Sequence, residues 1–231
     1  MRCPRNWVPA MWRDALLVAG KDLRIELRSR ITINQILPFA FIVLIVFAFA
    51  LDTSPDTLKE VAPGLFWLAV LFSSILGVDR AVAIERNDSA GEGLLVYGVD
   101  PGGIFLGKAA SVFVQLFLLE IVLILGMVVL YGPKIGGWLL IVLSAVFATL
   151  GISAAGVLYS QLASGSKAKQ TLLPLLLVPV ASPVLLAATK SWQDAFAGTS
   201  SLGDPWLRLL IVFAVVYLAL GSVFYSSILE G

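Results

Sequence analysis

The chain of 231 residues contains no histidine and a single cysteine, Cys3. The lack of histidine excludes imidazole as a metal ligand, a haem ligand or a general base. A lone cysteine excludes an intrachain disulfide framework and a cysteine-rich metal site. A Ser–His–Asp hydrolytic set is also excluded. The sequence therefore offers little support for an enzyme, and no catalytic or metal-ligating residues are predicted.

Charged residues are also scarce, at 13% of the chain against about 25% in soluble domains. Hydrophobic residues make up 59%. A helix needs roughly 20 apolar residues to cross the hydrocarbon of a bilayer. No alternation of period two accompanies the apolar runs, so we expect helices rather than a transmembrane barrel. Six runs are long enough or nearly so: residues 31–51, 62–79, 104–131, 135–162, 172–189 and 206–229.

The positive charges are unevenly distributed between the loops. Of the 16 Lys and Arg residues, 12 lie in residues 1–30, in the connection after the second run or in the connection after the fourth. Positively charged loops stay in the cytoplasm. We therefore expect an all-α, multi-pass membrane protein with six transmembrane helices and both termini cytoplasmic. The net charge of +1 gives no indication of nucleic-acid binding.

Residues 1–30 form a polar, basic segment ahead of the first run. We expect them to form a cytoplasmic N-terminal amphipathic helix of the elbow type, followed by a six-helix transmembrane domain at 31–231. The helix would lie on lipid headgroups at the inner leaflet, although a plain positively charged anchor explains the charges equally well. A cleaved signal peptide is not expected, because the polar segment is too long. Apolar residues recur at helical spacing at Trp12, Leu16, Ala19, Leu23 and Leu27.

The longest polar interruption covers residues 80–103, between the second and third runs. We interpret its centre as a short amphipathic helix that docks on a soluble partner, because apolar anchors inside a polar rim are typical of contact surfaces. A solvated connector is the alternative. The docking residues would be Glu85, Arg86, Asp88, Glu92, Leu94, Leu95 and Tyr97.

Two polar residues, Gln115 and Glu120, lie within the third run. A charge near the bilayer centre is costly, so Glu120 is expected either to face a cavity or proton path, or to hydrogen-bond a neighbouring helix. The fifth run carries Pro174, Pro179 and Pro183. Proline removes backbone hydrogen bonds and kinks helices, which suits either a deformable gate or ordinary kinked packing.

One near-match to a phosphate-binding loop occurs at Gly102, Gly107 and Lys108. A true loop of this kind needs Ser or Thr in the next position to hold Mg²⁺. Ala109 supplies no hydroxyl group, so we do not expect this chain to bind and hydrolyse ATP itself.

Three stretches of the chain resemble the CcmB family, the haem exporter protein B permeases of cytochrome c maturation. Residues 62–69, 71–74 and 79–80 are similar to the family's second span. Residues 91–95 with 107–108 resemble its inner loop, and residues 173–174, 179 and 183–185 its proline-rich helix. Glu85-Arg86 followed by a glycine-containing stretch also resembles the broader ABC-2-type exporter permeases. The resemblance therefore indicates an exporter permease and leaves its substrate open.

The resemblance implies a permease subunit of an ABC transporter complex in the bacterial inner membrane. Its partners would be a separate cytosolic ABC ATPase subunit (CcmA-type), other cytochrome c maturation membrane proteins and a second copy of itself. Haem would be the substrate, or would be released from a haem chaperone. Three alternatives stay open: an ABC-2-type exporter of another substrate, a proton-coupled secondary transporter that uses Glu120, and a non-transporting scaffold.

Overall fold

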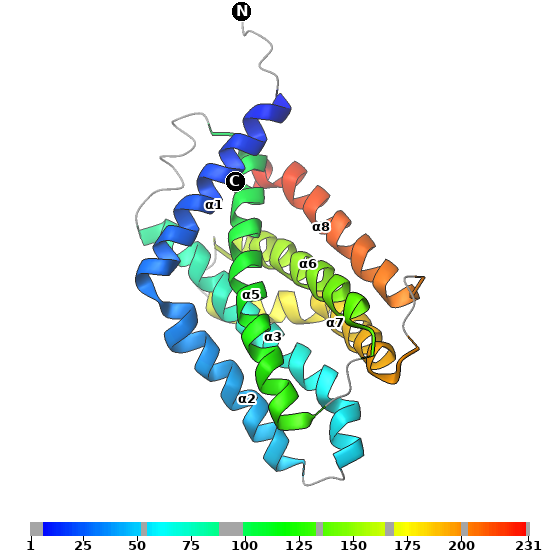
Figure 1. Cartoon of the computed structure of the whole chain (residues 1–231). Helices are drawn as coiled ribbons and strands as arrows, with labels where there is room; N and C mark the ends of the chain where they lie inside the picture. The colour runs from blue at the N-terminus through cyan, green and yellow to red at the C-terminus, as the bar shows by residue number, and fades with distance from the viewer. Residues whose placement is uncertain are drawn as a thin grey trace, which may run out of the picture.

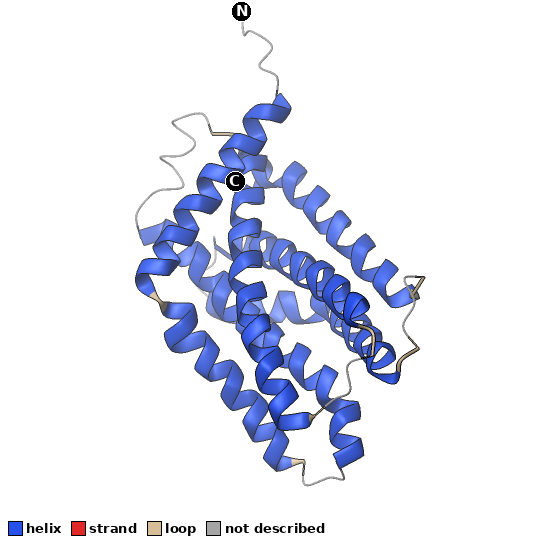
Figure 2. Cartoon of the chain, viewed as in Figure 1, coloured by secondary structure: helices blue, strands red, loops and turns tan. Residues whose placement is uncertain are grey.

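The computed structural model describes residues 7–51, 55–87, 99–132, 136–164, 169–199 and 203–229. Within these ranges all regular structure is helical, which confirms the predicted all-α class (Figure 2). The elements in chain order are α1 (Trp7–Ser29), η1 (Thr32–Ile36), α2 (Leu37–Ala50), α3 (Pro55–Asn87), α5 (Pro101–Tyr131), α6 (Trp138–Ser164), α7 (Lys169–Ala197) and α8 (Pro205–Leu229) (Figure 1).

Six helical stretches among the described residues are long and apolar enough to cross a membrane, as the sequence predicts. Each contains an 18-residue window of mean hydropathy between 2.0 and 2.7. These stretches are Thr32–Ala50, Thr57–Ala81, Pro101–Tyr131, Trp138–Ala163, Leu172–Ala197 and Pro205–Tyr225. The chain is therefore a multi-pass membrane protein.

Helix α6 forms the centre of the bundle. Of its apolar window, 72% is buried, against 17% for the first span. Small residues let its neighbours approach closely, as is common between helices in lipid. A Cβ atom on Gly151 would lie 2.7 Å from the Phe213 ring of α8, and one on Gly156 would lie 2.7 Å from the Val78 side chain of α3.

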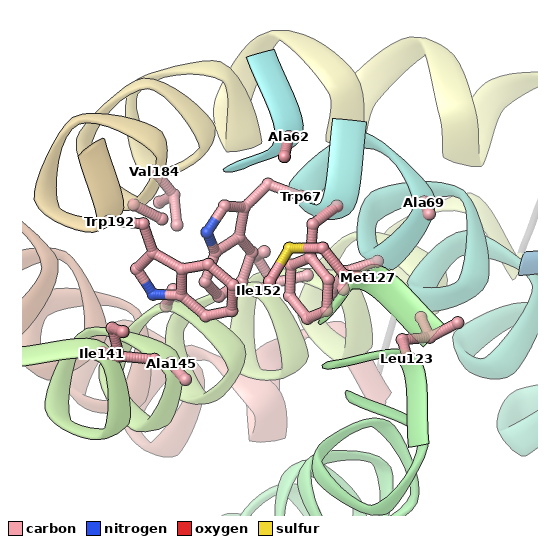
Figure 3. Packing of buried hydrophobic residues seen from close by; sticks show 14 of the residues in the cluster. Ala62, Trp67, Ala69, Leu123, Met127, Ile141, Ala145, Ile152, Val184 and Trp192 are labelled. Carbon is pink, nitrogen blue, oxygen red and sulfur yellow. The ribbon is translucent and has the colours of Figure 1, made fainter. Parts of the chain in front are cut away.

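An aromatic cluster joins α3 and α7 to α6 (Figure 3). The rings of Phe66 and Trp192 stack with centroids 4.5 Å apart, and Trp67 meets Trp192 edge-on at 5.4 Å. The Trp192 Nε1 group donates a hydrogen bond to Ser144 Oγ at 3.0 Å. Stacked and edge-on aromatic pairs contribute about 0.5–1.5 kcal/mol beyond their burial. This cluster therefore holds α3, α6 and α7 together.

Helix α1 lies against the beginning of α5 and turns through an elbow into α2 (Figure 1). At the elbow, Arg30 has a left-handed backbone with φ of 52°, and η1 is one π-helical turn. Both features interrupt the regular helix, so α1 and α2 take different directions. The end of α8 reaches the beginning of α5, because the carbonyl of Ser222 would lie 3.1 Å from a Cβ atom on Gly102.

Candidate functional site

The connection between α3 and α5 is shorter than the sequence suggests. Helix α3 continues through Glu85 and Arg86 to Asn87, and α5 begins at Pro101. Residues 80–87 and 101–103, which were predicted to belong to the polar connection at 80–103, are therefore parts of α3 and α5. Residues 81–86 contain no helix breaker, so the helix continues past the apolar run until the Asn-Asp-Ser sequence at 87–89.

Most of the predicted docking residues lie outside the described part of the chain. This holds for the side chains of Glu85 and Arg86 and for the whole of Asp88, Glu92, Leu94, Leu95 and Tyr97. Their role stays a prediction. What the structure describes is how the connection is held at its two ends.

At the end that leads into α5, the connection is hydrogen-bonded to both α5 and α1. The Asp100 side chain caps α5 by accepting a hydrogen bond from the Gly103 backbone N–H at 2.9 Å. Pro101 follows at the first helical position, where it is well tolerated. The Asp100 backbone N–H donates to Asp14 Oδ2 of α1 at 3.2 Å. A displacement of the connection at Asp100 would therefore act on α1 as well as on α5.

Glycines on the first turns of α5 form the contact with α1. A Cβ atom on Gly103 would lie 2.9 Å from the carbonyl of Met11, and one on Gly107 would lie 2.6 Å from the carbonyl of Ala15. The Gly102–Lys108 stretch is therefore a regular helical packing surface and not a loop that wraps a phosphate.

Helix α1 has three distinct faces. Asp14, Ala15 and Val18 lie toward α5. The apolar stripe predicted from the sequence is on a second face and points away from the bundle: Trp12 is 56% exposed and Leu16 is 74% exposed. A third, basic face carries exposed cations, namely Arg13, Arg24 and Arg28. An exposed apolar face beside a cationic face is the arrangement expected of a helix at a membrane surface.

Inside the bundle, Glu120 of α5 is buried and pairs with α6. Its Oε1 atom accepts a hydrogen bond from the Thr149 hydroxyl group. Its Oε2 atom has no hydrogen-bond partner in the part of the chain that the structure describes. Ser153, one turn further along α6, is also buried, and its hydroxyl group likewise has no partner among these described residues. The structure thus places a small polar patch between α5 and α6.

Gln115 and Glu120 are not part of one polar path. Gln115 lines a small cavity shared by α1, α3 and α5, whereas Glu120 faces α6. The proline residues of α7 lie elsewhere again: Pro179 and Pro183 are exposed on the outer surface of the bundle. The Ser182 hydroxyl group donates to the Pro179 carbonyl at 2.6 Å. In the single chain these two prolines therefore face outward and not into an internal path.

The cavity that Gln115 lines was not predicted from the sequence. Its other polar residues are Asp22, Glu26 and Arg80. They come from segments 54 or more positions apart along the chain, and each alone resembles an ordinary interface charge. Only the polarity of Asp79-Arg80 at the end of an apolar run marks that position as unusual.

The comparisons with known proteins agree on one family. The family model described as "CcmB protein" matches residues 13–230. Three curated relatives named "Heme exporter protein B" are each 27% identical to this chain. The match covers 78% of this chain and 81% of the protein from Haemophilus influenzae, 92% and 95% for Paracoccus denitrificans, and 86% and 90% for Pseudomonas aeruginosa.

Proposed function

Because the chain belongs to the CcmB protein family, we propose that it is the permease subunit of an ABC transporter complex in cytochrome c maturation. The observation that carries the proposal is the family match over residues 13–230, which includes most of α1 and all six spans. Relatives that match over most of their length are named for haem export. We extend that substrate to this chain, either as haem moved across the membrane or as haem released from a chaperone.

We place the protein in the bacterial inner membrane with both termini in the cytoplasm. The distribution of Lys and Arg supports this orientation. The α3–α5 connection then faces the cytoplasm, beside α1 and the end of α8. A separate ATPase subunit docks there and supplies the nucleotide site. Two copies of this chain serve the ATPase pair, and other membrane proteins of cytochrome c maturation complete the assembly.

The described helices suit the transmission of a movement from that connection into the bundle. Helices α3 and α5 are 33 and 31 residues long, so each joins the docking region to the far side of the spans without a break. Helix α1 is in backbone contact with α5 at Gly103 and Gly107. Closure of the ATPase pair would therefore move α5 and α1 as one unit relative to the aromatic cluster of α3, α6 and α7.

Charge reversal tests the docking segment. We expect Arg86→Glu combined with Glu92→Arg to weaken co-purification with the ATPase at least tenfold, about 1.4 kcal/mol, and to abolish permease-dependent ATP hydrolysis. Lys190→Glu is the matched control, because Lys190 is exposed on α7 far from this connection in the chain. Unchanged co-purification and hydrolysis in the double variant would contradict the proposal.

A second candidate, a proton-coupled secondary transporter, is favoured by one observation: the buried Glu120 carboxylate with an unbonded Oε2 atom. It is distinguished by reconstitution of the purified chain alone in liposomes. Uptake driven by an ion gradient without any ATPase would support this candidate, and uptake that depends on the ATPase and ATP would support the ABC permease.

A further inference from the structure

A cavity of about 20 Å³ lies where the elbow between α1 and α2 meets α3 and α5. Two of the four elements that line it, α1 and α5, are the ones that we propose move together with the ATPase, and α3 belongs to the aromatic cluster relative to which they move. The lining residues that matter are Asp22 and Glu26 of α1, Ile36 of η1, Gly77 and Arg80 of α3, and Gln115 of α5.

The charged groups at this cavity are only partly satisfied by direct contacts. Asp22 pairs with Lys21 at 3.2 Å through Oδ1, but its Oδ2 atom is buried and has no hydrogen-bond partner among the described residues. Within the same part of the chain, the Arg80 Nε group is also buried without a partner, and its Nη1 group makes a long contact of 3.5 Å to Gln35 Oε1. A buried polar group that lacks a hydrogen bond carries a free-energy cost, because it has lost its contacts with water.

The cavity is large enough to remove that cost. A water molecule needs about 10–15 Å³ of cavity volume and two to four polar partners. Asp22, Arg80 and Gln115 supply both acceptors and donors around the same space. A bridging water would satisfy the acid on α1 and the guanidinium group on α3 together.

We propose that this cavity is a hydrated joint in which water links Asp22 of α1 to Arg80 of α3, and that Arg80 is the positioning residue for the end of α3. The role of Arg80 rests on the proposed function, because α3 runs from Arg80 straight to the docking residues Glu85 and Arg86. Glu85 follows Arg80 by five positions, so the two residues lie roughly 7.5 Å apart along the helix axis.

The hydrogen bonds at the joint can rearrange at a small cost in free energy. Water can shift between partners without leaving a buried charge unpaired, which a direct ion pair does less easily. Gly77 leaves room on α3, since a Cβ atom there would meet only the end of the Ile36 side chain at 3.9 Å. On the α1 side, Glu26 Oε1 accepts a 2.6 Å hydrogen bond from the Thr32 backbone N–H and so ties the wall of the cavity to the elbow.

A double-mutant cycle tests the joint without any partner. Asp22→Asn, Arg80→Gln and the double variant are compared by thermal unfolding of the purified chain in detergent. We expect the double variant to lose no more thermal stability than the worse single variant, because both changes remove one linked pair. Shifts that simply add would overturn the joint. Arg13→Gln is the matched control, since the Arg13 side chain is 75% exposed on α1.

The positioning role is tested in the complex with the ATPase. The quantity measured is the amount of haem moved or released per ATP hydrolysed. We expect Arg80→Gln to lower this ratio at least fivefold while the ATPase still co-purifies, and Arg80→Lys to recover part of it. A wild-type ratio in Arg80→Gln would overturn the positioning role. A wild-type chain that binds no ATPase would contradict the proposed function instead, and the unfolding cycle would still decide the joint.

Discussion

At the scale of single residues, Glu120 is a costly side chain, because it is buried within a span. Ionised side chains at the centre of a transmembrane helix cost about 2.5–3.5 kcal/mol on insertion scales. The Thr149 hydroxyl group offsets part of this cost by donating to Oε1, and the same bond fixes α5 against α6. The structure therefore gives Glu120 a packing role that requires no transport activity.

Removal of that hydroxyl group should destabilise the bundle slightly. We expect Thr149→Val to lower the free energy of unfolding by about 0.6–1.7 kcal/mol, the range measured for hydrogen bonds between membrane helices. Thr149→Ser keeps the donor and should stay close to wild type. Reversible unfolding in mixed SDS micelles measures both variants. Equal stability of Thr149→Val and wild type would show that the bond contributes nothing.

The sequence identified residues that are rare in their surroundings but not the residues that they contact. Glu120 was visible because an acid is unusual within an apolar run. Its partner Thr149 was not, because a threonine in a transmembrane helix attracts no notice. Asp22 and Arg80 were missed for a related reason: a charge near the end of a span is ordinary until the fold encloses it.

At the scale of helices, the contact between α1 and α5 depends on glycine. The carbonyl of Ala15 and the side chain of Val18 occupy the space where a Cβ atom on Gly107 would lie, at 2.6 and 2.7 Å. A carbonyl of a helix backbone moves only if the whole helix moves. Any side chain at position 107 must therefore displace α1 from α5.

A pair of glycine substitutions tests this contact. We expect Gly107→Ala to lower the free energy of unfolding by about 1–3 kcal/mol, the usual cost of overpacking. Gly20→Ala is the control within α1, because nothing lies within 4 Å of a Cβ atom there. It should stabilise the helix by up to about 1 kcal/mol, since alanine is the better helix former.

Urea or SDS titration with the Trp fluorescence as signal separates the two variants. The account of the contact fails if Gly107→Ala is as stable as Gly20→Ala.

Helix number followed from the sequence, but helix ends did not. The length of an apolar run reflects the thickness of the hydrocarbon layer, whereas a helix continues until a capping residue or a helix breaker ends it. This explains why α3 extends to Asn87 beyond its apolar run, and why α5 starts at Pro101, directly after its Asp100 cap. The amphipathic pattern of α1 was also read correctly, but the face that packs on α5 was not the predicted stripe.

At the scale of the whole molecule, α3, α5, α7 and α8 pack on α6, and α1 is attached to the bundle through α5 and the elbow (Figure 1). The family resemblance seen in the sequence was confirmed by the match over residues 13–230. The attachment of α1 to α5 was not predictable, because it depends on three glycines, two of which, Gly102 and Gly107, first resembled part of a phosphate-binding loop. The structure makes those glycines part of the same surface that holds the α3–α5 connection at Asp100.

The central claim is that the α3–α5 connection faces the cytoplasm and carries the ATPase. Cys3 is the sole cysteine, so Cys3→Ser gives a cysteine-free background in which Glu92→Cys is a single reporter. The measurement is labelling with a membrane-impermeant maleimide in inside-out and right-side-out vesicles, with and without the ATPase. We predict labelling in inside-out vesicles only, and protection when the ATPase is bound. Labelling in right-side-out vesicles, or no protection by the bound ATPase, would contradict the account.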